Sequence, residues 1–176
     1  MILAAKAGLC ILLAAGGTGT GFYFSALLTR RREQLSQLIQ GLEILKSEIY
    51  NSRLPMKYVF RHAAAISCGA AALLFDRFSD ILETGDLREV EVLWEKTVLE
   101  VFPESGPMKK KDRAVLQALG SRLGALDSEE QCQDIQRAVR ELSICLSEAS
   151  EEVQTKGRVY RTAGTAAGLL LVVLIL

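Results

Sequence analysis

One segment limits the fold more than any other: residues 128–176 contain no proline and change character partway along. In the first part, apolar residues recur at alternating gaps of three and four, which places them on one face of an α-helix. These residues are Ile135, Ala138, Leu142, Cys145, Ala149 and Val153. From Thr162 onward no residue is charged, and the segment ends in an unbroken run of Leu, Val and Ile. This change is typical of a helix that packs against protein first and then enters lipid. Ser128 and Gln131 match a capping box, so we expect the helix to begin there.

Residues 7–28 form a second uncharged stretch, which is long enough to cross a bilayer. The three arginines at 30–32 directly after it are typical of a stop-transfer flank, so we predict an uncleaved anchor over 1–28. The alternatives are a cleaved signal peptide and a lipoprotein site at Cys10. The C-terminal segment 162–176 is shorter than a standard transmembrane span. The alternative interpretation of this segment is a hydrophobic tail buried in a soluble core.

The orientation follows from the basic residues that border the two apolar segments. They are the arginines at 30–32, then Lys156, Arg158 and Arg161. The positive-inside rule assigns both groups to the cytoplasm, so both termini are expected on the far side of the membrane. The predicted parts are an N-terminal transmembrane anchor at 1–28, a cytoplasmic helical bundle at 29–161 and a C-terminal transmembrane segment at 162–176. The middle part holds 20 of the 21 Lys and Arg and all 21 Asp and Glu, which leaves a net charge of −1. This balance gives no indication of a nucleic-acid partner.

The middle part has helical spacing throughout, which predicts an all-α, six-helix-type bundle flanked by N- and C-terminal transmembrane helices. We expect helix breaks before Pro55, near Gly69, at 83–86 and in the loop 102–107. Asp112 is expected to cap a short helix that Gly124 ends. Trp94 and Leu142 each lie in the middle of an apolar stripe, and we expect both in one core.

No residues form a catalytic, metal-binding or cofactor-binding pattern, so we predict neither an enzyme nor a cofactor or metal. The only histidine, His62, has no carboxylate or nucleophile near it in sequence and is interpreted as a surface or packing residue. Two charged patches are candidate partner-contact sites, although such patches are more often simply solvated. The basic patch is Lys109, Lys110, Lys111 and Arg113, and the acidic patch is Glu89, Glu91 and Glu95.

Several short motifs, taken in order over nearly the whole chain, resemble the stage III sporulation protein AB family. They are Ile49 and Tyr50 before Leu54 and Pro55, then Trp94, then Leu119, Gly120, Leu123, Gly124, Asp127 and Gln131, and finally Tyr160, Arg161, Gly164, Gly168 and Leu169. The chain departs from the family pattern at Ser52 and Arg53, where the family often has threonine and proline. It also departs at Thr162 and Ala163, in the last glycine motif. Each motif is weak alone, but together they are fairly specific.

The resemblance implies a mother-cell protein of the outer forespore membrane, within the channel complex that links mother cell and forespore. It also implies a bundle like the cytoplasmic domain of type II secretion F proteins. Such a bundle serves as a platform beside a cytoplasmic ATPase similar to stage III sporulation protein AA and beside other channel-complex subunits. The sequence leaves homo-oligomerisation open. A second hypothesis is a membrane-anchored helical adaptor or sensor that has no ATPase partner.

Overall fold

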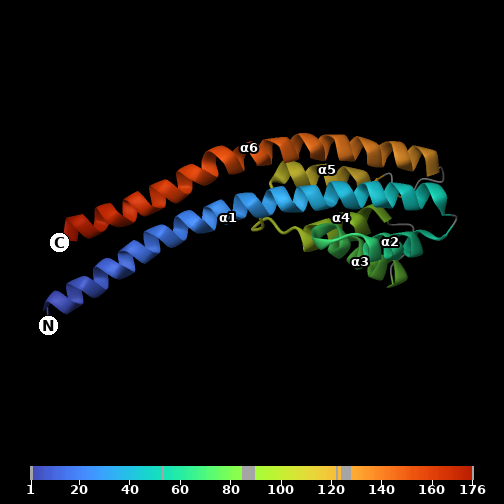
Figure 1. Ribbon diagram of the computed structural model, residues 1–176. Helices are drawn as coiled ribbons and strands as arrows, with labels where there is room; N and C mark the ends of the chain where they lie inside the picture. The colour runs from blue at the N-terminus through green and yellow to red at the C-terminus, as the bar shows by residue number, and fades with distance from the viewer. Residues whose placement is uncertain (1, 53, 85–89, 122, 124–127, 176) are drawn as a thin grey trace. The chain divides into compact units, whose positions relative to one another are not determined.

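The computed structural model describes residues 2–52, 54–84, 90–121, 123 and 128–175, without the side chains of 2–18, 84, 161, 164 and 167–175. Its elements can be followed from blue to red in Figure 1. They are α1 (Ile2–Asn51), α2 (Met56–Ile66), α3 (Gly69–Thr84), α4 (Val90–Val101), α5 (Lys110–Gly120) and α6 (Ser128–Ile175). Every regular element in the described residues is a helix, so the predicted all-α, six-helix class is confirmed.

The contacts divide the chain into two compact units. One unit, the helical domain, is Glu33–Ser147. The other unit, the helix pair, joins Met1–Arg32 with Glu148–Leu176. Helices α1 and α6 each contribute to both units, because each runs through a boundary between them. The predicted domain boundaries at 28 and 161 separate the expected membrane spans from the bundle. The division into two units does not test them, so they stay predictions.

The core of the helical domain is built from leucines of α1 and aromatic residues of α2, α3 and α4. Four leucines at helical spacing on α1 are fully buried, which agrees with the apolar stripe of the sequence. They are Leu35, Leu38, Leu42 and Leu45. The rings of Phe60 and Phe78 lie 4.8 Å apart, and those of Phe78 and Trp94 lie 4.9 Å apart, both edge to face. Trp94 and Leu142 are both fully buried in this unit, so that prediction is confirmed.

Trp94 also joins α4 to α5 through a polar contact. Its indole Nε1 donates a hydrogen bond of 2.6 Å to the carbonyl oxygen of Leu116. Gly120 approaches the same ring so closely that a Cβ at this position would lie 2.6 Å from Trp94 Cδ1. The indole is therefore satisfied as a donor and enclosed on the side of α5.

The joint between α2 and α3 depends on one glycine and one side chain of α1. Gly69 has a φ of +56°, a left-handed conformation that favours glycine. The next amide, that of Ala70, donates to Gln37 Oε1 at 2.8 Å, so Gln37 satisfies a free N–H at the start of α3. The expected break near Gly69 is confirmed, and α3 begins at the glycine itself. The expected break at 83–86 lies mostly outside the described residues.

The start of α5 differs from its prediction. The helix begins at Lys110, so Asp112 lies inside its first turn and is not the residue that precedes it. The carboxylate of Asp112 instead accepts a hydrogen bond of 2.9 Å from the backbone N–H of Lys109. Asp112 thus reaches back to the cap position, as the third residue of a capping box does. Gly124, the expected end of this helix, lies outside the described residues.

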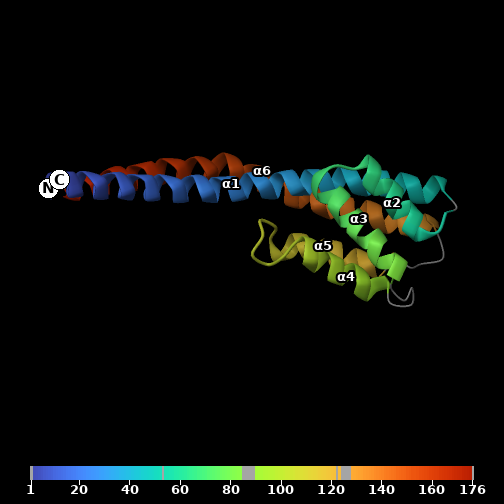
Figure 2. The same ribbon diagram turned by 90° about the horizontal axis from the view of Figure 1, so that it is seen from below.

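Small residues and an ion pair between the two helices lie within the helix pair. Gly21 and Ser25 of α1 and Gly157 of α6 are buried, and a Cβ on Gly157 would lie 3.5 Å from Ser25 Oγ. Further along, Arg31 Nη1 lies 2.9 Å from Glu152 Oε2. The two helices run side by side in both views of the pair (Figure 1 and Figure 2). Close backbone approach at small residues is a common way to join two helices.

The predicted membrane spans find no support in the described residues. Across them, no helix has a stretch that is both apolar enough and long enough to cross a membrane. The side chains of residues 1–18 and 167–176, which make up much of both predicted spans, lie outside this finding.

Candidate functional site

The basic patch begins on a loop that is held firmly against the domain. Phe102 and Met108 are buried at the two ends of this loop, and the amide of Gly106 donates to the carbonyl oxygen of Pro103 at 2.9 Å. The three lysines that follow are exposed. They are Lys109, Lys110 and Lys111. The end of the loop and the first turn of α5 therefore present these three ammonium groups, the lysine row, from a fixed backbone.

Arg113 was predicted as a fourth member of this surface patch, but the structure places its side chain in the interior. Its side chain is only 6% exposed, and its Nη1 donates a hydrogen bond of 2.9 Å to the carbonyl oxygen of Met108. A guanidinium that satisfies a buried carbonyl fixes the loop and does not present charge to a partner. Arg113 therefore helps to fix the backbone at Met108, directly before the three lysines.

The acidic patch lies on α4, next to α5. Glu91 and Glu95 are exposed, whereas Glu89 lies outside the described residues. Glu95 Oε1 accepts a hydrogen bond of 3.3 Å from Gln117 Nε2, which links α4 to α5. Glu100, on the same helix, is paired with Arg77 of α3 at 2.6 Å, and this contact raises the pKa of Arg77. The acidic and basic residues thus lie on neighbouring helices of one unit.

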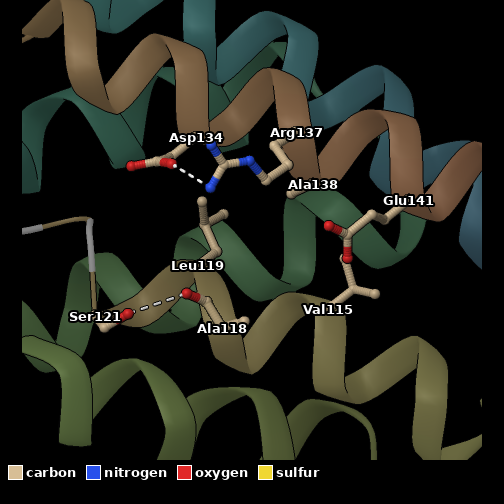
Figure 3. Close-up of a pocket in the computed structure, with 8 residues that line it drawn as sticks. All are labelled: Val115, Ala118, Leu119, Ser121, Asp134, Arg137, Ala138 and Glu141. Atoms are coloured by element: carbon tan, nitrogen blue, oxygen red, sulfur yellow. Dashed lines mark hydrogen bonds and ion pairs between the residues drawn. The ribbon is translucent and has the colours of Figure 1, made fainter.

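A shallow groove of about 330 Å³ lies between α5 and α6. Its lining combines apolar residues with the charged side chains of Asp134, Arg137 and Glu141 of α6, which Figure 3 shows. The apolar lining comes mainly from Val115, Ala118, Leu119 and Ala138. Arg137 Nη1 lies 3.4 Å from Asp134 Oδ1, so those two charges compensate each other. The sequence prediction missed this groove, although the small residues Ala118 and Ala138 were its visible signal.

A second charged cluster joins α2 to α3. Arg61 Nη2 lies 2.7 Å from Asp80 Oδ1, and Nη1 lies 2.9 Å from Asp76 Oδ1. The hydrogen bond to Asp80 is the main reason why the pKa of Arg61 is raised. His62, the next residue, has Nδ1 2.8 Å from Glu48 Oε2 of α1. Sequence spacing did not reveal these partners because each lies on a different helix.

Within the described residues, no group of three or more His, Cys, Asp or Glu is placed to hold a metal ion. The helical domain presents a surface that includes a lysine row at the start of α5, exposed acidic residues on α4 and a shallow groove between α5 and α6. Such a surface is suited to contact with another macromolecule.

The comparisons with known proteins agree with one another. The model of the family described as stage III sporulation protein AB matches residues 6–176. A relative of that name from Bacillus subtilis (strain 168) is 27% identical over 166 residues, which cover 94% of this chain and 96% of the relative. A solved structure of stage III sporulation protein AB is 26% identical with a TM-score of 0.61, and the match covers 70% of this chain and 96% of that structure.

Proposed function

The chain belongs to the stage III sporulation protein AB family, and from that premise we propose that it is a non-enzymatic membrane platform that docks a cytoplasmic ATPase. Its role in sporulation follows from the family itself. The finer proposal adds a place, the channel complex linking mother cell and forespore, and a partner, an ATPase similar to stage III sporulation protein AA.

The fixed lysine row of the helical domain is the observation that carries the docking proposal. Lys109, Lys110 and Lys111 stay exposed while buried Arg113 helps to fix the backbone directly before them. A fixed backbone has little conformational freedom to lose on binding, whereas each long lysine side chain still loses some, and surface charges mainly steer the encounter of two proteins. The proposed contact therefore consists of the lysine row, facing an acidic surface of the ATPase. Glu91 and Glu95 lie on α4, where Glu95 contacts Gln117 in the second half of α5, and they form a separate acidic part of the proposed surface.

The membrane part of the proposal rests on the helix pair. Residues 7–28 and 162–176 carry no charge, and the exposed residues Arg30 and Arg158 stand close to them in the sequence. In the proposed arrangement both apolar segments cross the outer forespore membrane, the helical domain lies in the mother-cell cytoplasm and both termini lie on the far side. A thiol probe at Leu176→Cys, in a chain whose four native cysteines are replaced, tests this hairpin, because labelling from the cytoplasmic side contradicts it.

The docking proposal is tested with the purified full chain and the purified ATPase. We expect micromolar binding, about −8 kcal/mol, that weakens as salt is added. Replacing the three lysines by glutamate should slow association more than it speeds dissociation. The matched control is Arg140→Glu, an exposed cation on α6, which should leave the association rate nearly unchanged. If two folded proteins fail to bind at high micromolar concentration, docking is wrong and the adaptor without an ATPase becomes the better hypothesis.

A further inference from the structure

We propose that the helix pair binds the head groups of anionic phospholipids, through exposed arginines that lie next to a belt of exposed aromatic residues. The belt consists of Phe22, Tyr23 and Phe24 of α1 and Tyr160 of α6. The arginines are Arg30 and Arg32 of α1 and Arg158 of α6. This inference rests on the proposed membrane platform and adds the class of lipid that the platform selects.

The aromatic belt is open to its surroundings on most sides of α1. Phe22, Tyr23 and Phe24 are 53%, 61% and 52% exposed. Consecutive helical residues point about 100° apart, so three exposed neighbours cover more than half of the helix circumference. Only Gly21 and Ser25, four residues apart and thus on one face, are buried at this level. Large aromatic side chains turned outward are unfavourable in water and typical of a membrane interface.

Two contacts show that the belt continues from one helix to the other at the same level. The rings of Phe24 and Tyr160 lie 5.7 Å apart. One level further along the pair, Arg31 Nη1 meets Glu152 Oε2 at 2.9 Å. These two contacts set an antiparallel register: from the aromatic level to the ion pair, the residue numbers rise from 24 to 31 on α1 and fall from 160 to 152 on α6. The belt therefore includes residues of both helices and is not confined to α1.

The arginines of the next level divide into one buried and three exposed side chains. Arg31 is 1% exposed and forms an ion pair with Glu152. The carboxylate of Glu152 also forms an ion pair with Lys156, whose Nζ lies 2.8 Å away. Arg30, Arg32 and Arg158 are exposed and form no ion pair with a carboxylate of the described residues. The internal ion pair thus fixes the two backbones, while three guanidinium groups face outward from them.

The distance between belt and arginines matches a lipid interface. Tyr23 and Arg30 are seven residues apart, on one face of α1, which corresponds to about 10 Å along the helix. A bilayer places its phosphates just outside the zone where aromatic side chains gather. Arginine binds phosphate oxygens in a bidentate manner, so an anionic phospholipid satisfies both features at once. A water-soluble partner would satisfy the arginines but would leave the belt exposed.

The test uses the full chain in neutral detergent, with dioleoylphosphatidylglycerol and dioleoylphosphatidylcholine added in turn. Native mass spectrometry counts the bound lipids and gives an apparent affinity for each. We expect the anionic lipid to bind at least tenfold more tightly. The triple variant Arg30→Gln, Arg32→Gln, Arg158→Gln should lose most of this preference, because each arginine near an anionic surface contributes roughly fivefold.

The matched control removes the same number of charges from the helical domain, by Lys109→Gln, Lys110→Gln and Lys111→Gln. We expect this control to keep the preference of the unaltered chain. Equal losses in both triple variants would overturn the site, because they would indicate a simple effect of net charge. A preference that survives the arginine variant would overturn it as well.

Flotation with vesicles of pure dioleoylphosphatidylcholine separates this inference from the platform proposal. A chain that floats with these neutral vesicles but shows no lipid preference overturns the head-group site alone. A chain that floats with neither neutral nor anionic vesicles overturns the membrane platform, and the site with it.

Discussion

The two units of this protein place their aromatic residues in opposite ways. In the helical domain, Phe60, Phe75, Phe78 and Trp94 are fully buried and touch one another. In the helix pair, Phe22, Tyr23 and Phe24 are more than half exposed, while Ser25 and Arg31 are buried. The first arrangement is that of a water-soluble core. The second reverses it, with polar and small groups between the helices and large apolar groups outside.

In the proposed membrane arrangement, the two units are stabilised by different forces. Removing apolar surface from water is the main stabilising term for the helical domain. Lipid provides no such driving force between helices, so a pair in lipid relies on close packing of small residues and on internal polar contacts. Gly21, Ser25 and Gly157 provide the first of these, and the ion pair of Arg31 with Glu152 provides the second.

The largest expected effect concerns the aromatic core. Trp94→Ala removes a fully buried side chain and its hydrogen bond to Leu116, so we expect a loss of about 3–5 kcal/mol in the unfolding free energy of the helical domain. Urea unfolding followed by circular dichroism measures it. Trp94→Phe should lose less because an aromatic ring remains. Val92→Ala, at an exposed position of the same helix, serves as the control. An equal, small shift for Val92→Ala and Trp94→Ala would mean that Trp94 is not in the core.

The second prediction concerns the ion pair of the helix pair. Glu152→Ala leaves the buried guanidinium of Arg31 without this carboxylate, and breaking a buried pair costs about 3 kcal/mol or more. Hydrogen exchange of the backbone amides near 25–32 and 150–157 should therefore accelerate strongly, while the helical domain stays protected. Glu151→Ala, an exposed neighbour, should change little. Unchanged protection after Glu152→Ala would show that the ion pair does not stabilise the helix pair.

The third prediction tests how tightly the core is packed around Trp94. A Cβ at Gly120 would overlap the indole ring, so Gly120→Ala should destabilise the helical domain by about 1–3 kcal/mol. Thermal unfolding monitored by the fluorescence of Trp94, the only tryptophan, reports it directly. Gly19→Ala is the matched control in the helix pair, because no atom lies within 4 Å of its added Cβ. A neutral or stabilising Gly120→Ala would contradict the close approach of α5 to this ring.

The smallest effect is expected at the start of α3. Gln37→Ala removes the acceptor for the amide of Ala70 and should cost about 1 kcal/mol. Gln40→Ala, exposed on the same helix, should stay within about 0.5 kcal/mol of the unaltered chain. Urea midpoints for the two variants give the comparison. Equal midpoints would show that Gln37 does not act as a cap.

The helices themselves were predictable because their signals are local. Apolar spacing on α1 and α6, the break before Pro55 and the glycine at 69 each depend on residues that are close in sequence. The burial of Trp94 was predictable for the same reason, since it lies in the middle of an apolar stripe. Local patterns of this kind determine which face of a helix is buried, even before its neighbours are known.

The charged contacts were not predictable, because each joins two helices. Arg61 with Asp80 depends on how α2 packs on α3, and the burial of Arg113 depends on the loop before α5. One available signal was overlooked. Arg31 lies four residues before Leu35, in register with the buried stripe of α1, so its burial was readable from the sequence. The sequence prediction placed it, with Arg30 and Arg32, in the basic flank that follows the predicted membrane anchor.

The most direct test of the central claim, that the two units face different solvents, compares two exposed positions. Tyr23 in the helix pair and Leu73 in the helical domain are 61% and 57% exposed. A spin label is attached at Tyr23→Cys or Leu73→Cys in the full chain, with the four native cysteines replaced and the protein in phospholipid vesicles. We expect the label at 23 to collide more with oxygen, which concentrates in lipid, and the label at 73 to collide more with a water-soluble nickel complex. Preferential collision with the nickel complex at both positions would contradict the account.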